Sequence, residues 1–240
     1  MRILIVNDDG MNASQLLPLI KWCNKLGTVT TAVPKFEQSG KSHGIEIHKP
    51  FEAKEIELEP GIKVWAVDST PADCVRFAVL GLKMEFDLVI SGVNKGLNVG
   101  VDMMYSGTVG AALEAVNLGL KAISLSTPPE AYDFATRQLD YIFEYVFKHQ
   151  LLEKNDIYNI NIPASPKGIK ITRQGGPYYT DDFIPIGDNM YRPHGYSIWT
   201  DRNDDTLDTD ATFHGYISIS PLTTNKTCID VYEELSALNK

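Results

Sequence analysis

Two adjacent carboxylates, Asp8 and Asp9, directly follow an apolar run near the start of the chain. The run, residues 3–6, is typical of a strand that is covered on both faces within a parallel sheet. Ligands of open α/β sheets bind beyond the carboxyl ends of the strands, where both Asp side chains would lie. Because neighbouring buried anions repel each other, the pair favours a site for a hard cation such as Mg²⁺ or Mn²⁺. The alternative is an Asx-rich turn in which Asp9 or Asn12 caps the next helix.

A second polar loop, residues 35–44, leaves the carboxyl end of the next predicted strand, residues 28–33. It carries Ser39, Lys41 and His43 among glycines, and its Ser and Lys side chains could approach a metal or a phosphate. A flexible loop without any ligand has a similar composition. A protonated His43 near phosphate would favour binding at mildly acidic pH. Lys41 and His43 are therefore candidates for tuning the substrate or the pH optimum, and not for essential chemistry.

Two further polar loops follow later strands and could bind an anion. Residues 91–100 carry three glycines and two asparagines, which indicates unusual backbone dihedrals or close approach to a ligand. In the other loop, Ser106 or Gly107 would cap a helix over residues 109–118. A helix N-terminus with free N–H groups, beside the hydroxyls of Ser106 and Thr108, makes an anion site. The GxxxxGK[ST] spacing of a Walker loop is absent.

Strands alternate with helices along the chain. Strands are predicted over residues 3–6, 28–33, 86–90, 122–126, 158–162, 169–172 and 215–221, with an edge hairpin within residues 45–67. Helices are predicted over residues 14–26, 109–118, 132–149 and 229–238, and another from residue 70. Thr70 and Asp73 read as capping residues of that helix. The strand–helix–strand start predicts a right-handed βαβ unit and a parallel sheet, and so an α/β protein.

Residues 177–210 form a long polar and aromatic segment. Its acids lack the EF-hand spacing and the terminal Glu of that loop, so a solvated loop is favoured over a second metal site. The acids are Asp201, Asp204, Asp205, Asp208 and Asp210. The segment is long for a connection and carries six aromatic residues and Arg192, types that are enriched at interface cores. We therefore expect an ordered arm laid against a second subunit; the alternative is a lid over its own active site.

The totals describe one globular domain, residues 1–240, with residues 177–210 as an arm or loop extension. A net charge of −9 argues against a nucleic-acid polymer as partner, although a bound metal would permit a small anionic substrate. The three cysteines are odd in number and form no CxxC pair, which indicates reduced thiols in a cytoplasmic protein. The chain begins with a strand and no apolar run approaches about 20 residues, so no membrane segment is expected.

Several motifs, in order along nearly the whole chain, resemble those of a known family. They are ILIVNDDG at residues 3–10, Ser39-Gly40, TPADCV at residues 70–75, SGVNKG at residues 91–96, YSGTVGAA at residues 105–112 and GYISISPL at residues 215–222. Their succession resembles the SurE (survival protein E) family, which comprises metal-dependent 5'-nucleotidases that also act as broad phosphatases. The chain departs from the family pattern at Lys41 and His43, and residues 177–210 follow no family motif.

The resemblance implies a Rossmann-like three-layer α/β/α fold with a mainly parallel sheet and a C-terminal oligomerisation arm. It implies that Asp8, Asp9, Ser39 and Asn94 hold one divalent ion per subunit, Mg²⁺ or Mn²⁺. It further implies that Ser106, Gly107 and Thr108 contact phosphate, with Asn94 close to both. The implied substrates are nucleoside 5'-monophosphates or other small phosphomonoesters, with 3'-nucleotides and short polyphosphate as further candidates. The implied assembly is a homodimer or a homotetramer.

The chemistry of these residues fits phosphoester hydrolysis. A hard cation on Asp8 and Asp9 would lower the pKa of a bound water and provide a nucleophile. Either Asp8 or Asp9 could act as general base, and the sequence leaves that choice open. The main alternative is a nucleotide- or sugar-phosphate-binding regulator without turnover, which would not need the Asp pair. A metal-dependent glycosyltransferase would need a donor-sugar pocket, and no motif indicates one.

Overall fold

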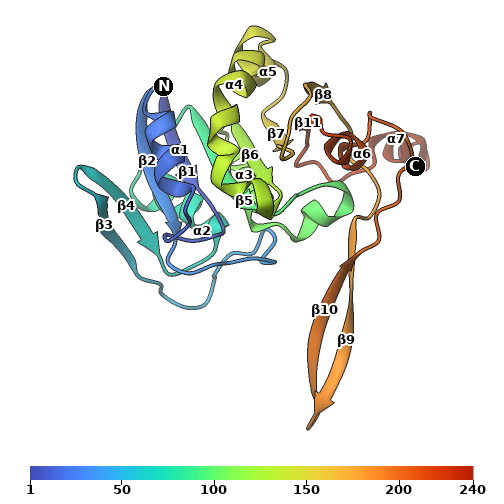
Figure 1. The fold of residues 1–240 in the computed structure, drawn as a ribbon, viewed down its shortest axis with the longest axis horizontal. Coiled ribbons are helices and arrows are strands. Elements are labelled where there is room, and N and C mark those ends of the chain that lie inside the picture. Colours follow the sequence, from blue (N-terminus) through green and yellow to red (C-terminus); the bar gives the residue numbers. More distant parts are fainter. Residues whose placement is uncertain (240) are drawn as a thin grey trace.

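A nine-stranded sheet forms the centre of the computed structural model, which describes residues 1–239 (Figure 1). In spatial order the strands are β3 (Ala53–Glu59), β4 (Ile62–Val67), β2 (Thr28–Pro34), β1 (Arg2–Val6), β5 (Leu88–Lys95), β6 (Ala122–Thr127), β7 (Ile157–Asn161), β11 (Ile217–Pro221) and β8 (Ile169–Ile171). The strands from β4 to β7 pair in parallel, whereas β3 and β11 run antiparallel to β4 and β7. The predicted parallel sheet and edge hairpin are confirmed.

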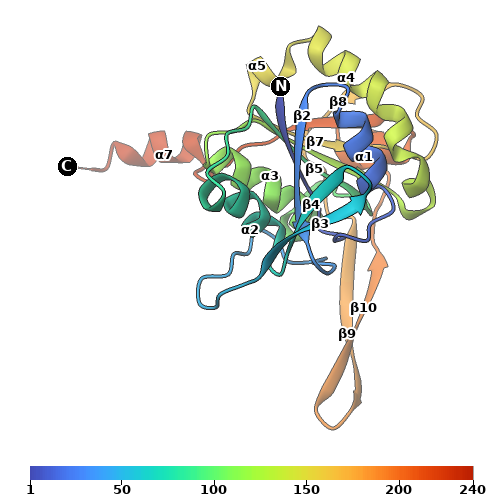
Figure 2. The ribbon, with the colours of Figure 1, turned by 90° about the vertical axis from the view of Figure 1, so that its left-hand side faces the viewer.

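Helices cover both faces of the sheet and complete three layers (Figure 2). They are α1 (Leu16–Cys23), α2 (Pro71–Arg76), α3 (Gly107–Asn117), α4 (Leu139–Lys148) and α5 (Leu151–Lys154). Because side chains of a strand point alternately to opposite faces, β1 contributes to two cores. Ile3 and Ile5 belong to the core beside α1 and α4, whereas Leu4 and Val6 belong to the core beside α2 and α3. The three-layer α/β fold is confirmed.

Two predicted helix caps position the start of α2 and of α3. Thr70 Oγ1 accepts a hydrogen bond from Asp73 N at 3.1 Å, and Pro71 occupies the first helical position of α2. Ser106 Oγ accepts from Val109 N, also at 3.1 Å, and so caps α3. The structure therefore selects Ser106 over Gly107 as the capping residue, and it fixes the N-terminus of α3 at the carboxyl edge of the sheet.

One helical prediction and one strand prediction need correction. The helix expected over residues 132–149 is wrong in its first half, where a 3₁₀ helix (Pro129–Gln138) precedes α4. Helix α2 continues from Arg76 as a π-helical turn (Phe77–Gly81). Strand β5 extends to Lys95 through residues that were expected to form a loop. The pairing of β5 with β6 shifts register between Ser91 and Asn94. This irregularity accommodates a loop-like stretch of backbone within the strand.

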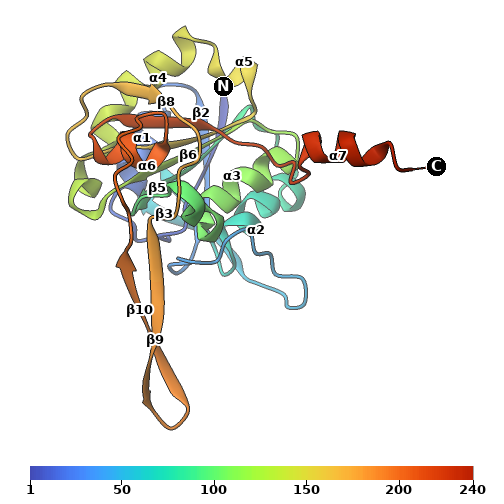
Figure 3. The same ribbon diagram turned by 90° about the vertical axis from the view of Figure 1, so that its right-hand side faces the viewer.

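The expected arm begins as an antiparallel hairpin that projects alone from the body (Figures 1 and 3). It consists of β9 (Tyr179–Gly187) and β10 (Met190–Ser197), whose residues are almost all exposed. An isolated hairpin is marginally stable in water, so this one needs other contacts to persist. That these contacts come from a second subunit stays a prediction.

The prediction of a solvated loop for the acid-rich stretch after the hairpin is wrong for its last two acids, whereas Asp201, Asp204 and Asp205 are exposed or partly exposed. Asp208 and Asp210 are fully buried in helix α6 (Asp208–Phe213). Asp208 Oδ1 accepts from the backbone amides of Gly100 and Gly175 at 3.1 and 2.7 Å. Buried carboxylates are tolerated when they accept such bonds, so these acids serve the fold.

The predicted terminal helix is confirmed as α7 (Ile229–Ser236). It has no buried residue and extends away from the body in Figures 2 and 3. Across residues 1–239, none of the helices combines the length and the apolar character that crossing a membrane requires.

Candidate active site

Four segments of the chain bring oxygen-bearing side chains together at the carboxyl edge of the sheet. Asp8 follows β1, Ser39 follows β2, Asn94 lies near the end of β5, and Ser106 caps α3. All four line one pocket with a volume of about 200 Å³. The pocket forms because parallel strands end at the same edge of the sheet. The sequence prediction that these residues meet is thus supported by their placement.

Asp8 is buried, and both of its carboxylate oxygens accept hydrogen bonds from one residue of α3. Thr108 Oγ1 donates to Asp8 Oδ1, and Thr108 N donates to Asp8 Oδ2 at 3.2 Å. Burial raises the pKa of Asp8, and the bonds from Thr108 oppose that shift. Thr108 was expected to contact phosphate; in this structure its hydroxyl is instead engaged by Asp8.

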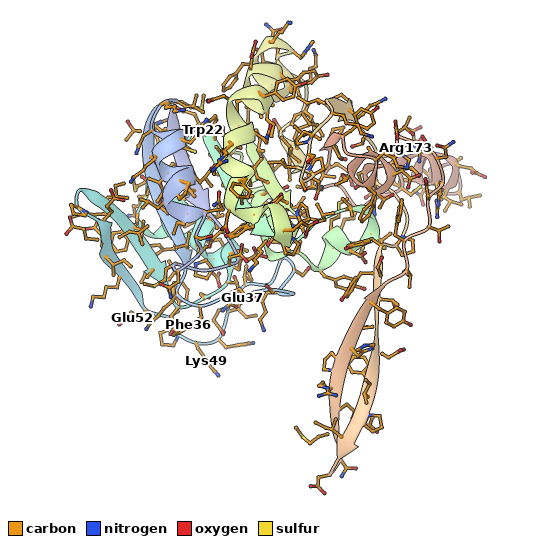
Figure 4. All side chains as sticks on the ribbon, viewed as in Figure 1. Trp22, Phe36, Glu37, Lys49, Glu52 and Arg173 are labelled. Carbon is orange, nitrogen blue, oxygen red and sulfur yellow. The ribbon has the colours of Figure 1, made fainter. Side chains whose placement is uncertain are left out.

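Asp9 lines an adjoining cavity of about 350 Å³ together with Glu37, Lys95 and Tyr132. Burial, followed by repulsion from Asp8, raises the pKa of Asp9 to about 6. Two donors oppose the shift: Lys95 N at 3.0 Å and the Tyr132 hydroxyl at 3.2 Å, both directed at Asp9 Oδ2. Glu37 lies at the lower edge of the body in Figure 4.

Ser39 and Asn94 contribute neutral oxygens beside the acids. Ser39 is exposed, and its hydroxyl donates to Glu37 Oε1 at 2.8 Å. Asn94 Nδ2 donates to Gly96 O at 2.8 Å, which leaves its carbonyl oxygen for another partner. Gly92 and Gly96 adopt positive φ angles on either side of Asn94, and this backbone turns Asn94 into the pocket wall.

Gly107 is the point at which α3 approaches Asp8. A Cβ atom added there would lie 3.1 Å from Asp8 Cβ and 3.2 Å from Asp8 Oδ2. It would also meet Pro71 Cγ at 3.1 Å, so a side chain at this position would require Asp8 or Pro71 to shift by a few tenths of an ångström. Ser106, which is buried beside it, lines the pocket with a hydroxyl whose proton remains available to a ligand.

The oxygen atoms of these four side chains form a ligand set that suits a hard cation. Between Met1 and Asn239, no Lys, Arg or His side chain forms an ion pair with Asp8 or Asp9. The same part of the chain holds no cluster of three or more His, Cys, Asp or Glu side chains suited to a metal. Two carboxylates with one hydroxyl and one amide oxygen match the preference of Mg²⁺ and Mn²⁺ for oxygen ligands.

Lys41 and His43 do not line this pocket. His43 Nε2 is 2.7 Å from Glu114 Oε2, and Arg76 Nη1 donates to the other carboxylate oxygen at 2.8 Å. Glu114 is buried in α3, so His43 fastens its loop to that helix. Lys41 lines a separate surface depression beside Glu46. Neither side chain is placed in the pocket of Asp8, and their role in tuning the substrate or the pH optimum stays a prediction.

Several residues near the site were not predicted from the sequence. Tyr132 reaches Asp9 from the 3₁₀ helix before α4, and no local pattern marks it. Asp102 and Tyr105 line the Asp8 pocket from the 3₁₀ helix Gly100–Tyr105. Only the two ends of this helix, Gly100 and Tyr105, belonged to segments that the sequence had indicated. Asn98 also lines the pocket, and its place in the Gly- and Asn-rich stretch was a usable signal.

The fold and the site define a three-layer α/β protein with an acidic, oxygen-rich pocket at the carboxyl edge of its sheet. The family model described as "Survival protein SurE" matches residues 3–181. The chain therefore belongs to the SurE family.

Relatives and a solved structure agree with this assignment. A protein of Thermoanaerobacter sp. (strain X514), named 5'-nucleotidase SurE, is 37% identical over 233 residues, which cover 92% of each chain. A protein of Desulforudis audaxviator with the same name is 37% identical over 255 residues, covering 100% of this chain and 97% of its own. The crystal structure of the SurE protein from Aquifex aeolicus matches with a TM-score of 0.79 and 29% identity, over 100% of both chains.

Proposed function

We propose that this chain is a divalent-metal-dependent phosphomonoesterase that hydrolyses nucleoside 5'-monophosphates to nucleoside and phosphate. The observation that carries the proposal is the Asp8–Asp9 pair, which lacks a basic partner within residues 1–239 and adjoins Ser39, Asn94 and the N-terminus of α3. A protein that only bound phosphate would have no use for two repelling acids at the same place. The relatives named 5'-nucleotidase SurE support the choice of substrate.

In this proposal, Asp8, Asp9, Ser39 and Asn94 hold the cation. When bound, Mg²⁺ or Mn²⁺ supplies positive charge at the phosphoryl oxygens and lowers the pKa of water. Ser106 Oγ–H donates to a phosphoryl oxygen at the helix N-terminus, where the helix dipole also favours an anion.

Asp9 is the better placed proton acceptor of the two acids. Both oxygens of Asp8 accept bonds from Thr108, whereas the two donors on Asp9 share Oδ2 and leave Oδ1 open.

Removing the metal tests this function directly. We expect the purified protein to hydrolyse adenosine 5'-monophosphate and p-nitrophenyl phosphate with added Mg²⁺ or Mn²⁺, and to lose activity on both in EDTA. Activity should return when either ion is added in excess. Adenosine 3'-monophosphate and short polyphosphate in the same assay define the range of substrates. Full activity in EDTA would contradict the metal role, and binding of nucleotide without turnover would favour the regulator.

We propose in addition that the β9–β10 hairpin binds a second copy of the chain. Its exposed apolar side chains include Phe183, Ile186, Met190 and Tyr191, each with an exposed fraction of 56–64%. Apolar side chains on the part of a hairpin that projects from the body favour association.

Shortening the hairpin tests this assembly. Asp181 pairs with Gly195 across the hairpin, so residues 182–194 can be removed and these two residues joined by a short Gly-Ser linker. We expect the mass measured by light scattering to fall from an oligomer to a monomer, because the interface is lost. A wild-type protein that is already monomeric at micromolar concentration would contradict the proposal and favour the lid.

A further inference from the structure

The loop that carries Ser39 is held by contacts on both sides of that residue, whereas Ser39 itself is exposed. Before Ser39, the backbone amide of Gln38 donates to the carbonyl oxygen of Asp8 at 2.7 Å. After Ser39, the loop is held through Ser42 and His43. The position of Ser39 therefore depends on two anchored ends of the loop.

The residues between these two ends have little packing of their own. Gly40 adopts a positive φ angle of 72°. Apart from its chain neighbours, a Cβ atom added to Gly40 would meet no heavy atom of residues 1–239 within 4 Å. Lys41 is exposed as well. A stretch with so few contacts is not fixed locally, so the anchor that follows it decides where Ser39 lies.

The anchor begins at Ser42, which bonds the 3₁₀ helix before α3. Ser42 N donates to Tyr105 O at 3.0 Å, and Ser42 Oγ donates to Met104 O at 2.6 Å. Helix α3 is also close, because a Cβ atom added to Gly110 would clash with Ser42 O and lie 2.9 Å from His43 Cα. The absence of a side chain at Gly110 thus lets the loop backbone lie directly on the helix.

His43 completes the anchor through a buried carboxylate. Glu114 lies within α3, and only 6% of its surface is exposed. His43 Nε2 is 2.7 Å from Glu114 Oε2, and Arg76 Nη1 donates to Glu114 Oε1 at 2.8 Å. Burying a carboxylate is costly unless its oxygens are paired, so the contact with His43 is favoured by the fold.

Helix α3 thereby links two groups of the candidate metal site. Thr108, at the start of the helix, donates to both carboxylate oxygens of Asp8. Glu114, further along the helix, contacts His43 and so the loop of Ser39. We propose that His43, through Glu114, positions Ser39 and thereby raises the affinity of the site for a divalent cation. The inference rests on the proposed function, in which Ser39 is a ligand, and adds a positioning residue outside the pocket.

The affinity for Mn²⁺ is measured on the purified protein without substrate, by following free Mn²⁺ in electron paramagnetic resonance titrations. In His43→Ala, we expect the Kd for Mn²⁺ to rise about tenfold, because losing a residue that orients a metal ligand typically costs about 10–100-fold in metal affinity. An unchanged Kd in His43→Ala overturns the proposal.

A second change shows whether His43 acts through Ser39. Ser39→Ala removes the proposed ligand itself and should also raise the Kd for Mn²⁺. When His43→Ala is added to Ser39→Ala, the Kd should not rise further, because no ligand is left to be positioned. Additive effects would overturn the proposal, since His43 would then act on the site by another route. An unchanged Kd in Ser39→Ala would overturn it too, because Ser39 would not be a ligand.

Arg76→Gln is the matched control, because it removes the other bond to the Glu114 carboxylate and leaves the contact with His43 in place. His43→Ala and Arg76→Gln should each lower the free energy of unfolding in EDTA, but only His43→Ala should raise the Kd for Mn²⁺. An equal rise of the Kd in both variants would assign the effect to weaker packing of α3 and would overturn the positioning role.

The outcomes separate this inference from the function on which it rests. A wild type that binds Mn²⁺ and hydrolyses nucleotides, with an unchanged Kd in His43→Ala, would keep its proposed function and lose only the positioning residue. A wild type that bound no Mn²⁺ would contradict the metal role in the proposed function, and the inference with it.

Discussion

Replacing Asp9 with asparagine should abolish most of the activity and at the same time stabilise the protein. Asparagine has nearly the same volume, and its Oδ1 can accept the bonds from Lys95 N and the Tyr132 hydroxyl. The change removes an anionic ligand and a proton acceptor, so we expect kcat/KM to fall by about 10²–10⁴-fold. Initial rates on adenosine 5'-monophosphate with saturating Mn²⁺ measure this loss.

The gain in stability follows from the raised pKa of Asp9. Its pKa of about 6 exceeds the ordinary value of 3.8, so between these values the folded chain holds a proton that the unfolded chain has lost. The free energy of unfolding of the metal-free protein should therefore fall as the pH rises from about 4 through about 6. Asp9→Asn removes this penalty and should add about 1–2 kcal/mol at pH 7.5, after allowance for partial exposure of the group.

Urea unfolding at pH 5 and pH 7.5, in EDTA, measures both effects. Asp133→Asn is a suitable control, because Asp133 is an exposed acid that lines the same cavity and, among residues 1–239, accepts a hydrogen bond only from Ser14. The control should keep its activity within about twofold and show the wild-type pH dependence of stability. An Asp9→Asn protein that retained activity, or was less stable than the wild type at pH 7.5, would refute the assignment.

The central fold was predictable because its signals are local. The buried run at residues 3–6 places β1, and the capping pattern of Thr70 and Ser106 places two helix starts. The errors arose where tertiary contacts decide. Apolar spacing does not distinguish a short 3₁₀ helix from an α-helix, so the start of the element at residue 129 was misread. Asp208 was predicted to lie in a solvated loop, because the sequence does not show that the backbone amides of Gly100 and Gly175 donate hydrogen bonds to it.

The candidate site was predictable where its residues directly follow strands. Asp8 and the loop of Ser39 were placed at the edge of the sheet in this way, because the ends of parallel strands converge whatever the details of packing. Asn94 was named through the resemblance to the SurE family. Tyr132 could not be predicted, since its contact with Asp9 depends on how a helix far along the chain packs over the edge of the sheet. His43 was misplaced for the same reason: its partner, Glu114, is distant in sequence and lies within a helix.

Replacing Ser106 with alanine should lower hydrolysis of every phosphomonoester by about the same factor. The Ser106 hydroxyl has two roles, since it accepts from Val109 N as the cap of α3 and, in the proposed function, donates to a phosphoryl oxygen. Losing one preorganised donor costs about 3 kcal/mol of transition-state stabilisation, or about a hundredfold in kcat. Rates on nucleotides, ribose 5-phosphate and p-nitrophenyl phosphate should therefore fall in parallel, because the contact is with phosphate alone.

A second capping residue separates the loss of the cap from the loss of the donor. Thr70 Oγ1 accepts from Asp73 N as the cap of α2, but Thr70 does not line the pocket of Asp8. Thr70→Ala and Ser106→Ala should each lower the free energy of unfolding by about 1 kcal/mol, and only Ser106→Ala should lose activity. If Thr70→Ala were as inactive as Ser106→Ala, a general weakening of the helix starts would explain both results. If Ser106→Ala instead changed only the preference among nucleosides, Ser106 would contact the nucleoside and the phosphate would have to bind elsewhere along the edge of the sheet.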